Sequence, residues 1–125
     1  MKHLISFEHL PDYVYIQTEG EASFRGFESL LNELIASPQW KPGTKQLVDH
    51  TNLEKDHLTS DEIDAIAAFF NDNRKMIGNG KCAFVVSDSA GFGMIRMYAL
   101  FGGELVHPQS RVFYSVEKAA EWLKS

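Results

Sequence analysis

The sequence has few of the residues that would mark a secreted, disulfide-stabilised or membrane protein. Cys82 is the single cysteine among 125 residues, so an intrachain disulfide is excluded and a reducing compartment suits the chain. No apolar run approaches the ~20 residues that span a bilayer, and residues 1–13 lack the apolar stretch of a signal peptide. We therefore expect a cytoplasmic protein with no membrane span.

Positive charge is also scarce. The chain has 12 Lys and Arg against 17 Asp and Glu, which gives a formal charge of -5, and its longest basic grouping is the pair Arg74 and Lys75. A protein that binds nucleic acid normally presents a basic face, and anionic lipid surfaces attract the same kind of face. The composition therefore argues against a nucleic-acid partner and against an anionic membrane surface.

Apolar and aromatic residues, in contrast, are plentiful. Hydrophobic residues make up 44% of the chain and include nine Phe, four Tyr and two Trp. A chain of this length normally forms one domain, and this apolar content supplies a core that needs neither a disulfide nor a structural metal. We expect residues 1–125 to form a single domain.

The hydrophobic pattern alternates between strand and helix along the whole chain. Strands are expected at 3–9, 13–18, 46–49, 82–86 and 111–114. Helices are expected to begin at Ser23, at Thr59 or Ser60, near Ala90 and at Ser115. The order β-β-α-β-α-β-α-β-α predicts an open mixed sheet covered by helices, in which each later strand is reached through a right-handed parallel crossover.

Local sequence signals place the turns and the central strand. Leu10-Pro11-Asp12 reads as a tight turn, so the first two strands form an antiparallel hairpin. Trp40-Lys41-Pro42-Gly43 has Pro and Gly where a type II turn favours them. Residues 82–86 are apolar throughout, as a strand buried on both faces requires, so we place this strand centrally. We interpret the polar residues 50–58 as a loop.

Several phrases of the sequence, in this order and spacing, resemble a known family. They are Trp40-Lys41-Pro42-Gly43 with Leu47-Val48-Asp49, Gly93-Met94-Ile95-Arg96-Met97-Tyr98, Arg111-Val112-Phe113, and Ala119-Ala120-Glu121-Trp122-Leu123. Together they resemble the bacterial SpoIIAA-like (STAS/SEC14-type) family of small proteins. The resemblance covers nearly the whole chain and implies a STAS-like sheet, a homodimer and no established activity for this branch.

The resemblance also points to one segment that is phosphorylated in other members. There a helix after the third strand starts with Asp-Ser-Ser-Gly, and a partner kinase phosphorylates one hydroxyl. The matching segment here is Asp56-His57-Leu58-Thr59-Ser60-Asp61, so the resemblance makes Thr59 and Ser60 the candidate phosphoacceptors. The glycine of the motif is missing, and Asp61 adds a negative charge.

The first candidate site is the start of the third expected helix, just after the central strand. It comprises Ser87, Gly91, Gly93, Arg96 and Tyr98. Open α/β sheets bind ligands at the carboxyl ends of their strands, and a helix N-terminus offers free N–H groups to an anion. Glycines would let a ligand approach the backbone and Arg96 would add a guanidinium, although a simply capped helix explains the same residues.

The second candidate site begins with Asp49 and His50, which also follow the end of a strand. Segment 49–57 holds two His and three carboxylates, but their spacing matches no metal motif, so we expect solvated loop charge and no metal or other cofactor. Cys82 begins a buried strand and is expected to be a small core residue. No catalytic residue stands out, and a hydrolase that uses His50 or His57 as its base is the weakest of three hypotheses.

The third candidate feature is the surplus of apolar side chains on the third expected helix. These are Phe92, Met94, Met97, Tyr98 and Phe101. They could pack the core, line a cavity or form a dimer interface. The leading hypothesis is therefore a non-enzymatic regulatory or interaction module, acting as a homodimer or with a protein partner. The alternative is a domain that binds a small anionic or amphipathic molecule.

Overall fold

A computed structural model describes residues 1–54, 58–87 and 109–125. Its strands are β1 (Lys2–Ser6), β2 (Val14–Glu21), β3 (Gln46–Glu54), β4 (Cys82–Val85) and β5 (Ser110–Phe113). Its helices are α1 (Phe24–Ala36), α2 (Ser60–Asp72), α3 (Arg74–Ile77) and α6 (Val116–Lys124). The helix expected near residues 90–101 lies outside the described residues.

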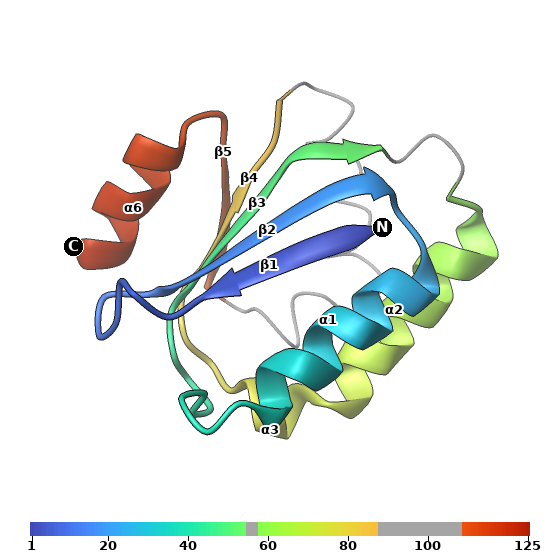
Figure 1. The fold of residues 1–125 in the computed structure, drawn as a ribbon, viewed down its shortest axis with the longest axis horizontal. Coiled ribbons are helices and arrows are strands. Elements are labelled where there is room, and N and C mark those ends of the chain that lie inside the picture. The colour runs from blue at the N-terminus through green and yellow to red at the C-terminus, as the bar shows by residue number, and fades with distance from the viewer. Residues whose placement is uncertain (55–57, 88–108) are drawn as a thin grey trace.

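The described strands form one five-stranded sheet in the order β1-β2-β3-β4-β5. The pair β1 and β2 is antiparallel, whereas β2, β3, β4 and β5 run parallel to one another. Helices α1 and α2 lie side by side on one face of the sheet, and α6 covers β3, β4 and β5 on the other (Figure 1). The predicted mixed sheet with an opening antiparallel hairpin is confirmed.

The predicted turns form as their residues require. The N–H of Asp12 donates to the carbonyl of His9 at 3.0 Å, which closes the hairpin turn. In the second turn, the N–H of Thr44 donates to the carbonyl of Lys41 at 3.1 Å, and Gly43 has a φ of +91°. A positive φ at that position defines a type II turn and favours glycine.

The third strand is longer than its sequence pattern predicts, and the expectation of a loop over 50–58 is wrong for residues 50–54. β3 continues to Glu54 because β2 also continues, to Glu21, and the two strands pair along this extension after an irregularity between Gln17 and Glu19. Only Leu53 of segment 51–54 is buried, so the segment lacks the regular apolar alternation that predicts a strand. Pairing with β2 decides its conformation instead.

Helix starts follow the expected caps. The side chains of Ser23, Thr59 and Ser115 each accept a hydrogen bond from the backbone N–H three residues later. These bonds satisfy donors that the first turn of a helix leaves without a partner. Helix α2 ends at Asp72, and the side-chain amide of the next residue, Asn73, donates to the carbonyl of Phe69 at 2.8 Å.

The sheet separates two apolar layers. The larger layer packs α1 and α2 on Ile16, Val48 and Phe84, and the smaller packs α6 on Leu47 and Val85. Strand β4 contributes to both layers, and all four of its residues are buried, as predicted for a central strand. It lies between β3 and the edge strand β5, and its Phe84 faces the larger layer, which contains the site described below.

Candidate functional site

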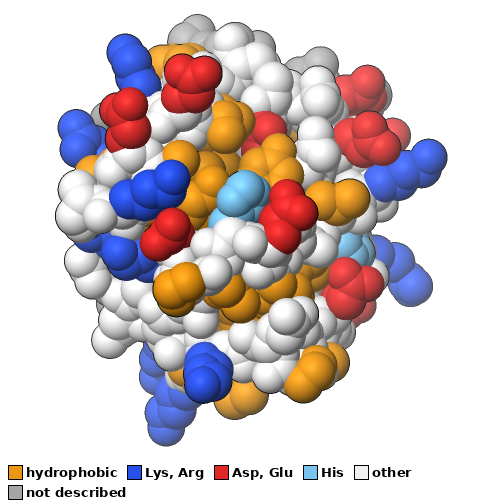
Figure 2. Space-filling model, turned by 60° about the vertical axis from the view of Figure 1, so that its left-hand side comes forward, with side chains coloured by type: hydrophobic (Ala, Val, Ile, Leu, Met, Phe, Trp, Pro, Cys, Tyr) orange, Lys and Arg blue, Asp and Glu red, His pale blue; other side chains and the backbone are white. Residues whose placement is uncertain are grey.

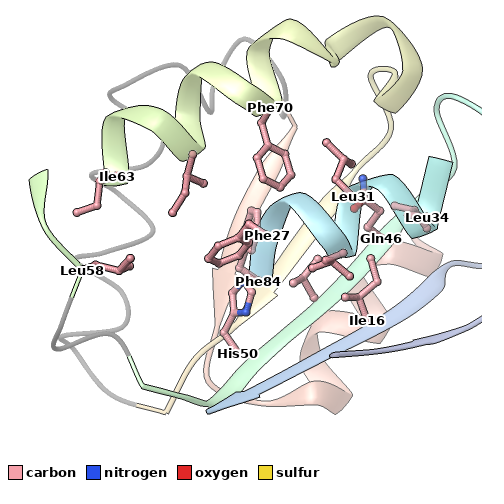
Figure 3. A pocket seen from close by; sticks show the side chains of 13 residues that line it. Ile16, Phe27, Leu31, Leu34, Gln46, His50, Leu58, Ile63, Phe70 and Phe84 are labelled. Atoms are coloured by element: carbon pink, nitrogen blue, oxygen red, sulfur yellow. The ribbon is translucent and has the colours of Figure 1, made fainter. Parts of the chain in front are cut away.

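A cavity of about 70 Å³ lies in the larger layer, between the sheet and helices α1 and α2 (Figure 3). Its lining comes from β2, β3, β4, α1, α2 and Leu58, which lies two residues before α2. The lining residues are Ile16, Phe27, Leu30, Leu31, Leu34, Gln46, Val48, His50, Leu58, Ile63, Ile66, Phe70 and Phe84. Gln46 and His50 are the only polar side chains in this set.

Simple periodicity brings these residues to the cavity. In a strand, alternate side chains share one face, so Gln46, Val48 and His50 all face α1 and α2 from β3. In α1 the spacing of three and four residues puts Phe27, Leu31 and Leu34 on the helix face that covers them. Leu58 and Ile63 are only partly buried and mark one end of the lining.

His50 lies in the floor of this cavity and is only 6% exposed. Its ring stacks on Phe84, with centroids 6.0 Å apart and planes 18° from parallel. Phe27 meets the ring edge-on, also at 6.0 Å (Figure 3). Two aromatic side chains therefore fix the orientation of the imidazole from both a strand and a helix.

Thr18 of β2 completes the environment of this imidazole. Its hydroxyl oxygen lies 2.7 Å from Nδ1 of His50 and 3.4 Å from the carbonyl oxygen of Asp49, and Thr18 itself is fully buried. Nε2 of His50 has no hydrogen-bond partner among the described residues. In the neutral ring, either tautomer leaves Nε2 with one role, as donor or as acceptor.

Burial keeps this imidazole uncharged. Loss of solvent lowers the pKa of His50 from its ordinary 6.5 to about 4, and the nearby charge of Asp49 offsets only part of that effect. At neutral pH the ring therefore contributes one uncharged hydrogen-bonding atom, Nε2, to an otherwise apolar cavity. That arrangement suits binding of an uncharged polar group.

Asp49 and His50 do not share a site, because adjacent residues of a strand point to opposite faces. The carboxylate of Asp49 accepts a hydrogen bond from the Tyr15 hydroxyl at 3.0 Å on the α6 side of the sheet. It also accepts from the backbone N–H of Thr51 at 3.0 Å and from the Thr51 hydroxyl. These contacts give the buried carboxylate a structural role within β3.

The carboxylate in turn affects its tyrosine partner. Burial, the hydrogen bond to Asp49 and the charge of Asp49 together raise the pKa of Tyr15 from 10.0 to about 12. The phenol therefore stays protonated and donates its hydrogen bond across the whole physiological range of pH. This pair belongs to the sheet face opposite the cavity.

The structure places the remaining candidate residues as far as it describes them. Ser87 is exposed just beyond β4, while Gly91, Gly93, Arg96 and Tyr98 lie outside the described residues. Thr59 caps α2 through its Oγ1, which accepts from the N–H of Glu62 at 3.1 Å, and Ser60 is the exposed first residue of that helix. Both hydroxyl side chains are thus at the helix start that the resemblance implied.

Cys82 is a core residue, as expected. It is fully buried at the start of β4, and burial raises the pKa of its thiol far above the ordinary value. Within residues 1–54, 58–87 and 109–125, no three His, Cys, Asp or Glu side chains converge in a way that could hold a metal ion. In the same part of the chain, no helix has the length and apolar character needed to cross a membrane.

Thr18 and Gln46 are site residues that reasoning from the sequence missed. Gln46 could have been found from the spacing 46, 48, 50, because that alternation puts it on the same strand face as His50. The sequence has no signal for Thr18, which is 32 residues away from its partner His50. Only the pairing of β2 with β3 brings the two side chains together.

A second, open hollow of about 800 Å³ lies at the β1 edge of the sheet, between β1, the hairpin turn and the start of α6. Its floor includes Tyr13 and Tyr15, and His9 stacks on Tyr13 with centroids 4.8 Å apart. Leu4 and Val116 line it and are 53% and 38% exposed. On the face shown in Figure 2, apolar side chains gather around a histidine, with charges of both signs around them.

The sheet order, the opening antiparallel hairpin and the helices on both faces define an open mixed-sheet α/β domain. No family model matches the chain. No curated protein matches it either. The chain has a SpoIIAA-like fold, because it matches a crystal structure described as having that fold.

The matching structure is an uncharacterised protein of the DUF3478 family from Shewanella loihica PV-4. The two share 18% sequence identity and superpose with a TM-score of 0.65, over 97% of this chain and 93% of that one. The STAS-like, SpoIIAA-like fold that the sequence resemblance implied is thereby confirmed. At this level of identity the likeness concerns the fold.

Proposed function

We propose that this protein is a binding domain for a small, uncharged, mainly apolar molecule, which lies in the cavity between the sheet and helices α1 and α2. The observation that carries the proposal is the imidazole of His50. His50 is 6% exposed, and its Nδ1 lies within hydrogen-bond distance of the Thr18 hydroxyl. The ring faces an otherwise apolar cavity, and its Nε2 has no hydrogen-bond partner among the described residues. Buried polar atoms in proteins normally have partners, so a ligand group supplies the missing hydrogen bond.

The chemistry of the cavity favours an uncharged ligand. The described lining contains no Lys, Arg, Asp or Glu, and an isolated charge transferred into an apolar site is very costly. Because the pKa of His50 is about 4, the ring itself offers no positive charge at neutral pH. An alcohol, ketone or amide can bond to Nε2 without that cost.

The size of the cavity limits the ligand further. An engineered apolar cavity of roughly 150 Å³ binds benzene, and the cavity here is about 70 Å³. The enclosed part of the ligand therefore has only a few heavy atoms. A longer apolar portion would pass between Leu58 and Ile63, which are partly exposed.

Titration with butan-1-ol and hexan-1-ol, followed by heteronuclear NMR, tests this function. We expect saturable shifts at cavity residues, with the resonances of Phe27 and His50 among the most affected. His50→Phe keeps an aromatic ring but removes Nε2, and should weaken binding about tenfold, since losing one hydrogen bond costs ~1 kcal/mol or more.

His3→Phe is the matched control, because His3 lies on β1 and contacts Glu33 at 3.0 Å, away from the cavity lining. It should leave alcohol binding unchanged. Shifts that never saturate, or that map away from the cavity, would contradict the proposed function.

A second candidate function, interaction with another copy of this chain, rests on the opposite side of the sheet. α6 packs on β3, β4 and β5, and Leu4 and Val116 remain exposed around the open hollow beside β1. Exposed apolar clusters of this kind are typical of protein interfaces. Light scattering over a concentration series should show a dimer that Leu4→Asp dissociates, and a monomer at high micromolar concentration would remove this candidate.

A further inference from the structure

The hydroxyl of Thr18 has one proton to donate and two neighbouring atoms that can accept it. Its Oγ1 lies 2.7 Å from Nδ1 of His50 and 3.4 Å from the carbonyl oxygen of Asp49. Thr18 is fully buried, so bulk water is not a third acceptor. A neutral imidazole has a single N–H, so the direction of the Thr18 hydroxyl decides which nitrogen of His50 carries that proton.

The contact between Thr18 and Asp49 allows one direction only. A carbonyl oxygen accepts hydrogen bonds and cannot donate them, so Thr18 is the donor in the 3.4 Å contact. The lone pairs of Oγ1 are then left for Nδ1, and the 2.7 Å contact is a hydrogen bond only when Nδ1 carries the proton and donates it. Two bonds then run in sequence, from Nδ1 to Oγ1 and from Oγ1 to the backbone.

The other tautomer leaves more groups without partners. If Thr18 donated to Nδ1, its bond to Asp49 would be lost and the ring proton would lie on Nε2. Nε2 has no acceptor among the described residues, and Phe27 and Phe84 pack against the ring (Figure 3). Buried N–H groups without an acceptor are rarer in proteins than acceptors without a donor. The described contacts therefore favour a proton on Nδ1.

We propose that Nε2 of His50 is a hydrogen-bond acceptor and that the cavity selects small molecules which place a donor, either a hydroxyl or an N–H group, against it. This inference rests on the proposed function and specifies the class of its ligand as donors, in preference to ketones, ethers and esters. Thr18 is then a specificity-determining residue, because its hydroxyl holds the ring proton on the nitrogen that faces away from the cavity.

The size of the selectivity follows from the cost of moving the ring proton. A ketone can only accept, so it binds the ring only when the proton has moved to Nε2 and the bond from Thr18 to Asp49 is lost. An alcohol can donate to Nε2 and leaves that bond intact. One hydrogen bond changes an equilibrium constant roughly two- to tenfold, and this range is the preference that we expect for an alcohol over a matching ketone.

Nitrogen-15 NMR of the ligand-free protein tests the tautomer directly. In a long-range correlation spectrum at neutral pH, the ring nitrogen that carries the proton has a pyrrole-type shift and the other has a pyridine-type shift. For His50 we expect the pyrrole-type shift at Nδ1 and the pyridine-type shift at Nε2. The reverse assignment, or averaged shifts that indicate an even mixture, would overturn the inference.

Propan-2-ol and propanone test the selectivity, because they match in heavy atoms and nearly in shape, and both are small enough for a cavity of about 70 Å³. Dissociation constants come from NMR titration of the full chain and of His50→Phe. The variant gives the affinity ratio of the two probes in the absence of Nε2. Relative to that ratio, we expect the unmodified protein to favour propan-2-ol roughly two- to tenfold.

Two variants of Thr18 link the selectivity to its hydroxyl. Thr18→Val removes the acceptor for Nδ1–H, so we expect a pyrrole-type contribution to appear at Nε2 and the preference for propan-2-ol to fall to the ratio seen in His50→Phe. Thr18→Ser retains a hydroxyl and should retain both the tautomer and the preference. A purely structural role for Thr18 would change stability but neither of these readouts, and that result would count against the inference.

The outcomes separate this inference from the proposed function. If neither probe binds in the cavity, the proposed function fails and the selectivity for donors fails with it. If both probes bind in the ratio seen in His50→Phe, or if Nε2 carries the ring proton in the free protein, the donor class is wrong while the proposed function stands.

Discussion

The hydroxyl oxygen of Thr18 lies 2.7 Å from Nδ1 of His50, and both side chains are buried between β2 and β3. This contact fixes which edge of the imidazole faces the cavity. It also satisfies the ring nitrogen that the cavity cannot reach. The contact makes Thr18 a positioning residue for the proposed site, and it has consequences for stability as well as for binding.

Replacing Thr18 by Val should destabilise the fold. The change keeps the shape of the side chain but leaves Nδ1 of a buried imidazole without its partner, which costs about 1–3 kcal/mol. The free energy of unfolding in urea at neutral pH measures the loss. Thr18→Ser retains the hydroxyl and should lose less, so equal stability of Thr18→Val and the unmodified protein would contradict the role of this contact.

His50 should make the protein less stable in acid. The unfolded chain protonates this residue near pH 6.5, whereas the folded protein does so only near pH 4, so protons favour the unfolded state between these values. A difference of that size is worth about 3 kcal/mol, at ~1.36 kcal/mol per pKa unit. This contribution is complete above pH 6.5 and lost as the pH falls to 4.

Comparison with His50→Phe isolates this effect, because the carboxylates, which also titrate in this range, are the same in both proteins. Urea unfolding at pH 7.5 and at pH 4 should show the stability of the variant rising relative to the unmodified protein by about 3 kcal/mol. A difference in stability that stays constant with pH would show that His50 is not buried in its neutral form.

Tyr15 should titrate well above the ordinary range. Its folded pKa of about 12 exceeds the usual 10.0, so stability contributed by its neutral form is present below pH 10 and lost as the pH rises towards 12. An ultraviolet titration of tyrosinate should show one late step that disappears in Tyr15→Phe. Tyr114→Phe, at a residue that is 60% exposed, should leave that step in place.

Gly78 should tolerate no side chain. Its φ is +81° with ψ of -170°, and a Cβ there would lie 2.1 Å from the backbone nitrogen of Gly43. Such backbone angles alone cost a residue other than glycine about 1–3 kcal/mol. Gly43→Ala is the matched control, since Gly43 has a φ of +91° but nothing within 4 Å of its Cβ position. Urea unfolding should show the larger loss in Gly78→Ala, and equal losses would argue against this close backbone approach.

Much of the fold could be predicted because its signals are local. Ser23, Thr59 and Ser115 are caps that the sequence identifies directly, and the unbroken apolar run beginning at Cys82 correctly predicts the buried strand β4. The Pro42-Gly43 pair predicts its turn in the same way. In each case the chemistry of a few adjacent residues is sufficient.

The candidate site was predictable only in part. The sequence directs attention to Asp49 and His50, but it places Asp49 at the end of a strand and His50 in a polar loop, whereas both are buried in β3. The pattern of residues 51–54 is too polar to predict a strand, and the partner that makes it one is the extension of β2. The apolar surroundings of His50, and therefore its low pKa, follow from that pairing.

The sequence by itself determined the order of strands and helices, the caps, the main turns and the central buried strand, because periodicity and turn chemistry act over a few residues. Tertiary structure alone decided that Thr18 meets His50, that Gln46 and His50 face one cavity, and that Asp49 belongs to the other side of the sheet. The physical reason is that strand register and helix packing set which side chains meet, and these depend on residues far apart in the chain.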